Sequence, residues 1–129
     1  MSENFYVTTP IYYINGEPHL GHTYTTVLAD TLARYHALAG ERSFFLTGSD
    51  EHGEKALEVA AERQETPQQV ADYYANIFRE AWDRLGIRYD RFIRTTDADH
   101  KAVVQSILQR VYDGGHIEFK EYEGLYCVG

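Results

Sequence analysis

The chain has 129 residues, a length typical of one domain, and 43% of them are hydrophobic, which is enough for a packed core. Its formal net charge is −8, which disfavours a chain whose own surface binds nucleic acid, because phosphate contacts need lysine and arginine. One cysteine excludes an internal disulfide framework, and no stretch approaches the ~18 apolar residues of a membrane span. Since the first residues also lack the pattern of a signal peptide, we expect a soluble, cytoplasmic domain with no membrane partner.

The first predicted element is a strand over residues 5–9, which are aromatic or β-branched and end at Pro10. Residues 10–20 are rich in proline, asparagine and glycine and are predicted to form a loop. A helix is predicted from residue 22 to about residue 38, with Gly40 as its C-cap. Its apolar residues at helical spacing are Tyr24, Val27, Leu28, Leu32, Tyr35 and Leu38.

A second strand is predicted over residues 43–47, ended by Gly48, and a helix over residues 54–63. Ala56, Val59 and Ala60 are expected to face inward on that helix. Thr66 and Pro67 predict the N-cap and first turn of another helix, which ends at Gly86. Its apolar face is expected to contain Val70, Tyr74, Ile77, Phe78, Ala81 and Leu85.

A third strand is predicted over residues 91–95, and Thr96 with Asp99 resembles a capping box. The helix that follows is expected to end at Gly114-Gly115 and to bury Val103, Val104, Ile107, Leu108, Val111 and Tyr112. Residues 117–128 alternate loosely, as short strands do. The alternation of strands and helices predicts an α/β fold with a parallel, Rossmann-like sheet, in which ligands bind beyond the carboxyl ends of the strands. The HLGH loop and the SDEHG loop should therefore face one crevice.

His19 and His22 stand at the predicted start of the first long helix. A helix start presents free N–H groups and the positive end of the helix dipole, which suit an anion. Two histidines three residues apart are more often an ordinary capped turn. The strand–loop–helix context, with Asn15 before them and Gly21 between them, favours a phosphate site instead.

Three segments together resemble one family. TTPIYYINGEPHLGHTYTTVLAD, FFLTGSDEHG and EYEGLYCVG are similar to the methionyl-tRNA synthetase family of class I aminoacyl-tRNA synthetases, in which HLGH corresponds to the HIGH motif. Leu20 in place of isoleucine conserves volume. The resemblance implies the N-terminal half of a Rossmann-like catalytic domain over residues 1–116 and the beginning of a connective insertion over residues 117–129. Because the lysine-bearing KMSKS motif is absent, we expect an N-terminal fragment of a longer enzyme that is inactive alone.

The family's reaction implies that methionine is activated by ATP, with Mg²⁺, to methionyl-adenylate and is then transferred to tRNA(Met). His19 and His22 would be the catalytic residues, with N–H groups aimed at charge that develops on phosphate oxygens. Asn15 and Gly21 would complete the ATP site, since Asn15 holds the phosphate loop and Gly21 lets adenine lie against the backbone.

The resemblance also implies a methionine site and a metal ligand. Asp50 would bind the ammonium group of the amino acid; the alternative is an acidic N-cap for the next helix, a role that Ser49 could equally fill. Ile11 would contact methionine through its backbone, and Tyr13 would contact it through its ring. Glu51 could equally be a solvated residue, a helix cap or a functional residue. Cys127 would begin a zinc knuckle in the full-length protein, but one thiolate cannot complete a four-ligand site, so we expect no zinc here.

Other interpretations of the sequence remain open. Class I synthetases for leucine, isoleucine, valine or cysteine share the histidine motif, although the TPIYYING and SDEHG loops favour methionine. A metal-binding hydrolase site could be built from His19, His22, Asp50 and His52, because imidazole and carboxylate groups are common metal ligands. A non-catalytic adenylate-binding module is a further possibility.

Overall fold

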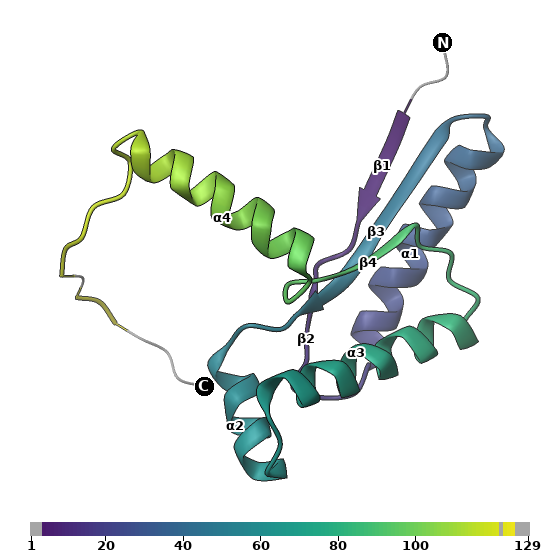
Figure 1. The fold of residues 1–129 in the computed structure, drawn as a ribbon. Helices are drawn as coiled ribbons and strands as arrows, with labels where there is room; N and C mark the ends of the chain where they lie inside the picture. The colour runs from purple at the N-terminus through teal and green to yellow at the C-terminus, as the bar shows by residue number, and fades with distance from the viewer. Residues whose placement is uncertain (1–3, 122, 126–129) are drawn as a thin grey trace.

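The computed structural model describes residues 4–121 and 123–125, along which strands and helices alternate (Figure 1). Every strand pair is parallel, so the predicted α/β fold with a parallel sheet is confirmed. No helix in the described part of the chain has the length and apolar character needed to cross a membrane. The elements in chain order are β1 (Asn4–Thr8), β2 (Tyr12–Tyr13), α1 (Leu20–Leu38), β3 (Arg42–Asp50), α2 (Glu54–Arg63), α3 (Pro67–Arg84), β4 (Arg91–Arg94) and α4 (Ala98–Asp113).

Strand β3 lies at the centre of the sheet, with β1 and β2 along one side and β4 along the other. β1 pairs with the first half of β3, and β2 pairs with its last two residues, so that Tyr13 lies opposite Asp50. On the other side, Arg94 of β4 lies opposite Ser49. The carboxyl ends of β2, β3 and β4 therefore meet at one end of the sheet, where parallel α/β folds bind ligands.

Helices α1 and α3 pack against one face of the sheet. Phe45 of β3 is fully buried in a cluster that also contains Tyr12, Ala29, Ala33, Ala75, Phe78, Trp82, Ile87 and Phe92. Successive strand residues point to opposite faces, so Tyr6 and Phe44 lie on the other face of the sheet. Their rings stack with centroids 5.7 Å apart and both stay exposed, which shows that this second face is open in the described part of the chain.

Several predicted boundaries are confirmed within one or two residues. α2 spans Glu54–Arg63, with Ala56 and Ala60 buried, and α3 begins at Pro67 after its N-cap Thr66. The apolar face of α3 is buried at Val70 and Phe78, but Leu85 is exposed. α1 begins two residues earlier than predicted, because His19 is its N-cap.

The prediction that Gly48 ends the second strand is wrong, because β3 continues to Asp50. A Cβ atom at position 48 would lie 2.0 Å from the backbone oxygen of Ile93. Gly48 is therefore a position where β4 approaches β3 too closely for any side chain, which is one of the ordinary uses of glycine inside a strand.

The apolar residues whose spacing predicted helix α1 do not form its inner face. Tyr24, Leu28 and Leu32 are exposed, and the buried residues are Thr26, Ala29, Asp30 and Ala33. The small residues allow the helix to lie close to the sheet. Asp30 is tolerated there because its carboxylate accepts hydrogen bonds from Arg34 Nε at 2.6 Å and from the backbone N–H of Arg88 at 2.8 Å.

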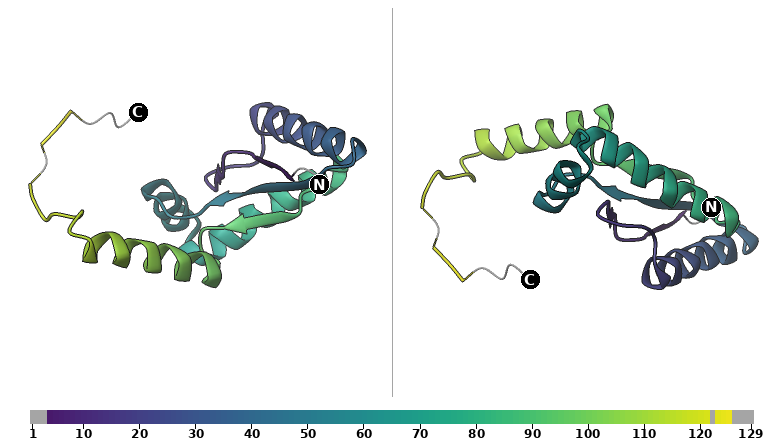
Figure 2. Two further views of the ribbon diagram at one scale, coloured as in Figure 1. Left: turned by 90° about the horizontal axis from the view of Figure 1, so that it is seen from above. Right: turned by 90° about the horizontal axis from the view of Figure 1, so that it is seen from below.

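Helix α4 does not bury the face predicted for it. None of its residues is buried, and it extends away from the sheet on the side of the molecule opposite α1 (Figure 2). The predicted capping box is absent: the N-cap is Asp97, Thr96 donates to Glu51, and Asp99 pairs with Arg91. Residues 117–121 and 123–125 form no strand, so that prediction is wrong for the described part of 117–128.

Candidate active site

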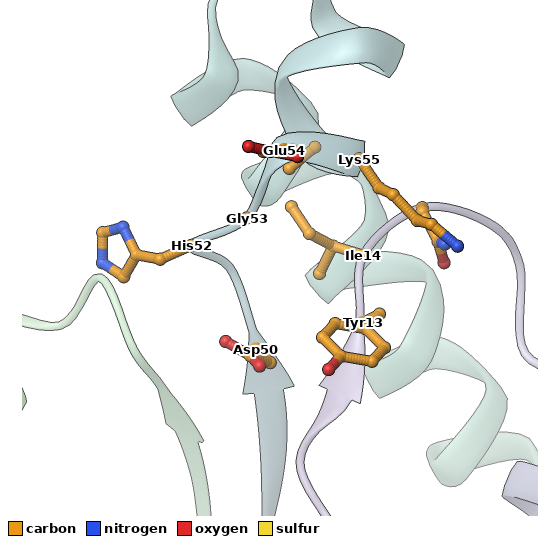
Figure 3. Close-up of a pocket in the computed structure, with 9 residues that line it drawn as sticks. Tyr13, Ile14, Asp50, His52, Gly53, Glu54 and Lys55 are labelled. Atoms are coloured by element: carbon orange, nitrogen blue, oxygen red, sulfur yellow. The ribbon is translucent and has the colours of Figure 1, made fainter. Parts of the chain in front are cut away.

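A pocket of about 380 Å³ lies where β2 and β3 end (Figure 3). Figure 3 shows Tyr13 and Asp50 side by side at the ends of their strands, while the ring of His52 turns away from them. The lining residues are Tyr13, Ile14, Asn15, Asp50, His52, Gly53, Glu54, Lys55 and Ala56. The first loop and the SDEHG loop therefore meet here, but the HLGH part of the first loop, which was predicted to share this crevice, does not line the pocket. The meeting point holds two carboxylates, an amide, an ammonium group and an aromatic ring.

His19 and His22 lie at the start of α1 and do not line this pocket. Nδ1 of His19 accepts a hydrogen bond from the backbone N–H of Gly21 at 3.0 Å, and Nδ1 of His22 accepts one from the backbone N–H of His19 at 3.2 Å. The two rings stack with centroids 3.7 Å apart. The histidines thus form a reciprocal capping box, a role usually taken by serine or threonine with glutamate or glutamine.

This cap determines which nitrogen of each ring carries the proton. A nitrogen that accepts a backbone N–H has no proton of its own, so in a neutral imidazole the proton lies on the other nitrogen. Both rings consequently present an Nε2–H donor that the cap does not use. The ordinary capped turn and the anion site that the sequence left as alternatives are compatible in this geometry.

The pKa of His22 lies below its usual value, first because partial burial disfavours the charged ring and second because His19 is close. The burial comes from Tyr12 and Phe78, whose ring centroids lie 4.7 Å and 5.3 Å from that of His22. His22 is therefore a neutral donor near pH 7. Tyr12 also holds the helix start, because its hydroxyl lies 2.9 Å from Oγ1 of Thr26.

Gly21 has a structural role that the sequence did not indicate. A Cβ atom at this position would lie 2.9 Å from Cε1 and 3.1 Å from Nδ1 of His19. The absence of a side chain lets the His19 ring fold over the first turn of α1 and accept the Gly21 N–H. Gly21 is thus needed for the cap itself, whatever ligand lies against it.

The predicted methionine-site residues are only partly brought together. Tyr13 and Asp50 line the pocket, and Tyr13 is 66% exposed, so its ring is free to contact a ligand. Asn15 lines the same pocket, whereas Ile11 does not. Lys55 also lines the pocket, and its place in the first turn of α2 gave no sequence signal for this.

Glu51 is the main residue that sequence reasoning underrated. Its side chain is 0% exposed and forms an ion pair with Arg94, with Nε of Arg94 2.6 Å from Oε1. The available signal was the alternation of Ser49, Asp50 and Glu51, which turns the first and third residues to the same side of the strand. The partner Arg94 is 43 residues away in the sequence, so local patterns could not identify it.

The metal-site interpretation finds no support in the geometry. Among residues 4–121 and 123–125, no group of three or more histidine, cysteine, aspartate or glutamate side chains is arranged to hold a metal ion. His19 and His22 use Nδ1 for the helix cap, and Nε2 of His52 lies 3.3 Å from the backbone oxygen of Thr95. Cys127, the predicted zinc ligand, lies outside the described residues.

The chain is similar to known proteins over almost its whole length. A family model described as tRNA synthetases class I (M) matches residues 5–129. The methionine–tRNA ligase of Deinococcus radiodurans is 54% identical over 126 residues, which are 97% of this chain and 18% of that protein. The chloroplastic/mitochondrial methionine–tRNA ligase of Arabidopsis thaliana is 47% identical over 98% of this chain and 20% of that protein.

A solved structure shares the fold. Methionyl-tRNA synthetase of Mycobacterium tuberculosis, in complex with methionyl-adenylate, superposes with a TM-score of 0.85 at 39% identity. The match covers 88% of this chain and 22% of that one, and it identifies the parallel sheet as Rossmann-like. The chain thus spans about a fifth of the length of the relatives that it matches.

Proposed function

This chain belongs to the family of class I tRNA synthetases (M), and we propose that it forms part of the catalytic domain of a methionine–tRNA ligase. The observation that carries the proposal is the likeness, at a TM-score of 0.85, to an enzyme whose structure contains methionyl-adenylate. Methionyl-adenylate is the product of the first half of the reaction. In that step the carboxylate of methionine attacks the α-phosphorus of ATP and forms a mixed anhydride with AMP, while the bond from the α-phosphorus to the oxygen that bridges to the β-phosphate breaks and pyrophosphate leaves. In the second step the methionyl group passes to tRNA(Met), and AMP leaves.

The first step needs no general base, because the attacking carboxylate is already an anion near neutral pH. Catalysis then depends on positioning the reactants and on donors directed at charge that develops on phosphate oxygens. The Nε2–H groups of His19 and His22 supply such donors beside the N-terminus of α1, whose dipole favours the same charge. Asn15 and Gly21 complete the proposed ATP site. Mg²⁺ enters this scheme as the companion of ATP.

We assign the amino-acid site to the pocket at the ends of β2 and β3. Asp50 pairs with the ammonium group of methionine, and Tyr13 packs its ring against the thioether, a favourable contact for sulfur. Ile11, which lies outside the pocket, contributes its backbone. Selectivity among amino acids of similar size must come from the shape of this site, because one methylene group is worth only about 1–3 kcal/mol.

The remaining parts of the proposal concern the longer protein. Residues 1–116 belong to the Rossmann-like domain, and residues 117–129 begin a connective insertion in which Cys127 supplies one ligand to Zn²⁺. Recognition of tRNA(Met) belongs mostly to other regions, in keeping with the net charge of −8 of this chain. A cytoplasmic location is part of the same proposal.

Amino-acid-dependent ATP–pyrophosphate exchange by the full-length protein tests the function. Methionine, leucine, isoleucine, valine and cysteine are supplied one at a time. Exchange with methionine alone supports the proposal. Exchange with another amino acid keeps the class I reaction and overturns the pocket assignment, while exchange with none overturns the enzymatic proposal.

A further inference from the structure

The residues on either side of Asp50 turn away from the pocket. As whole residues Ser49 and Glu51 are 0% and 5% exposed, and Oγ of Ser49 donates to Oε1 of Glu51 at 2.7 Å. Because strand side chains alternate between faces, burying these two residues on one side turns Asp50 to the other, where it lines the pocket.

Glu51 is held by side chains from β4 and from the residues that follow it. Nε of Arg94 lies 2.6 Å from Oε1 of Glu51, and Oγ1 of Thr96 donates to Oε2. Arg94 also donates to Oδ1 of Asp72 in α3 at 2.7 Å, so one guanidinium group connects the end of β3 to β4 and to α3. The buried carboxylate is thus paired with a charge and hydrogen-bonded at both oxygens, the condition under which a buried charge is tolerated.

The backbone around Asp50 is fixed by Thr95. The N–H of Glu51 donates to Oγ1 of Thr95 at 2.9 Å, and the N–H of Thr95 donates to the backbone oxygen of Ser49 at 3.3 Å. The backbone is therefore held immediately before and immediately after Asp50. Among the described residues, the carboxylate of Asp50 itself accepts no hydrogen bond, so it remains available to a ligand.

We propose that Glu51, paired with Arg94, is a positioning residue that fixes the direction of the Asp50 carboxylate toward the ammonium group of the amino-acid substrate. This inference rests on the proposed function. Arg94 neutralises Glu51, so that of the two neighbouring carboxylates only that of Asp50 is free to bind a cation. A displacement of about 1 Å in a positioning group is sufficient to lower a rate by about 100-fold, so loss of the Glu51 anchor has a measurable consequence.

The test compares Glu51→Gln with Asp99→Asn in the full-length protein, by pyrophosphate exchange with methionine and ATP varied separately. Gln keeps the size of Glu51 and removes its charge. Asp99 is a matched control, because it pairs with Arg91 of the same strand β4 but at the exposed surface. We expect Glu51→Gln to raise the KM for methionine by about tenfold or more and to change the KM for ATP by less than about twofold. Asp99→Asn should change neither.

A second variant covers the case in which Glu51→Gln does not fold. Arg94→Lys keeps the positive charge but loses the planar fork that reaches Glu51 and Asp72 together, and it should raise the KM for methionine by a smaller factor. Equal rises in both KM values, accompanied by a lower melting temperature, would indicate a general structural role and overturn the inference. If the Glu51→Gln and Arg94→Lys variants carry out methionine-dependent exchange with unchanged KM values, the inference about Glu51 is overturned and the proposed function stands. Absence of exchange in the wild-type protein would overturn the proposed function, and this inference with it.

Discussion

Nδ1 of His22 accepts the backbone N–H of His19, while the ring of His19 accepts the N–H of Gly21, so each histidine caps the helix that it helps to begin. This relationship leaves both Nε2–H groups at the positive end of α1. Helix capping and phosphate binding are therefore assigned to different nitrogens of the same two rings, and substitutions that keep one function while removing the other should separate them.

The first prediction separates the two functions at His19. Asparagine is among the best N-cap residues, so His19→Asn should keep the cap but lose the Nε2–H donor. We expect its melting temperature to stay near that of the wild type while pyrophosphate exchange falls by about 100-fold or more. His19→Ala should lose the same activity and also about 1 kcal/mol of stability. An active His19→Asn enzyme would exclude His19 from the phosphate site.

The second prediction concerns pH and His22. Because the pKa of His22 is lowered in the folded protein, the unfolded chain takes up a proton near the ordinary value of 6.5, while the folded chain does so only at lower pH. The unfolded state thus binds more protons in this interval, and stability is lost as pH falls from about 6.5 through the folded pKa. His22→Gln keeps a capping-box residue but does not titrate. Melting curves from pH 7.5 to 5 should show wild type losing stability relative to this variant, and parallel curves would contradict the lowered pKa.

The third prediction concerns Asp50. Asp50→Asn removes the negative charge proposed to bind the ammonium group, and we expect the KM for methionine to rise by about 30-fold or more, since loss of one partner of a charge pair costs about 2–5 kcal/mol. The KM for ATP should change little. Glu54→Gln is the matched control, because Glu54 lines the same pocket from the first turn of α2. Similar effects of both substitutions would show that pocket charge in general, and no particular contact of Asp50, controls binding.

The fourth prediction concerns the contact between β3 and β4. Gly48→Ala would place a Cβ atom 2.0 Å from the backbone oxygen of Ile93, and backbone cannot move aside as a flexible side chain does. We expect a loss of about 3 kcal/mol or more in the free energy of unfolding, measured by chemical denaturation. Gly16→Ala is the control, since a Cβ atom there meets nothing within 4 Å, and it should cost less than about 1 kcal/mol.

What the sequence predicted correctly depends on contacts between residues close in the chain. The cap of α3 by Thr66, the burial of Ala56 and Ala60, and the placement of His19 at a helix start each follow from a few neighbouring residues. Tyr13 and Asp50, which the family resemblance assigned to one site, do lie opposite each other, but on strand β2, which was predicted as part of a loop.

What the sequence did not predict depends on distant partners. Position 48 must be glycine because the backbone of Ile93 lies against it, and Glu51 can be buried because Arg94 pairs with it. Both partners lie on β4, and Arg94 is 43 residues from Glu51 in the sequence. The inner face of α1 was missed for a different reason. Its buried residues are small or polar, so the hydrophobic pattern selected the exposed stripe instead.

The last prediction concerns the 129-residue chain expressed alone. We expect no aminoacylation or pyrophosphate exchange, because the chain spans about a fifth of the length of its relatives. We also expect it to associate, since α4 exposes a continuous apolar stripe formed by Val103, Val104, Ile107, Leu108 and Tyr112. Sedimentation velocity should show concentration-dependent oligomers.

A charged side chain placed in the apolar stripe of α4 should prevent the association, because the charge would be buried between two apolar surfaces. Ile107→Glu should shift the sedimentation profile toward monomer, whereas Gln105→Glu, which adds the same charge about half a helical turn away, should not. Equal effects of the two substitutions would mean that net charge alone governs solubility. A monomeric wild-type chain would show that the apolar stripe of α4 does not drive self-association.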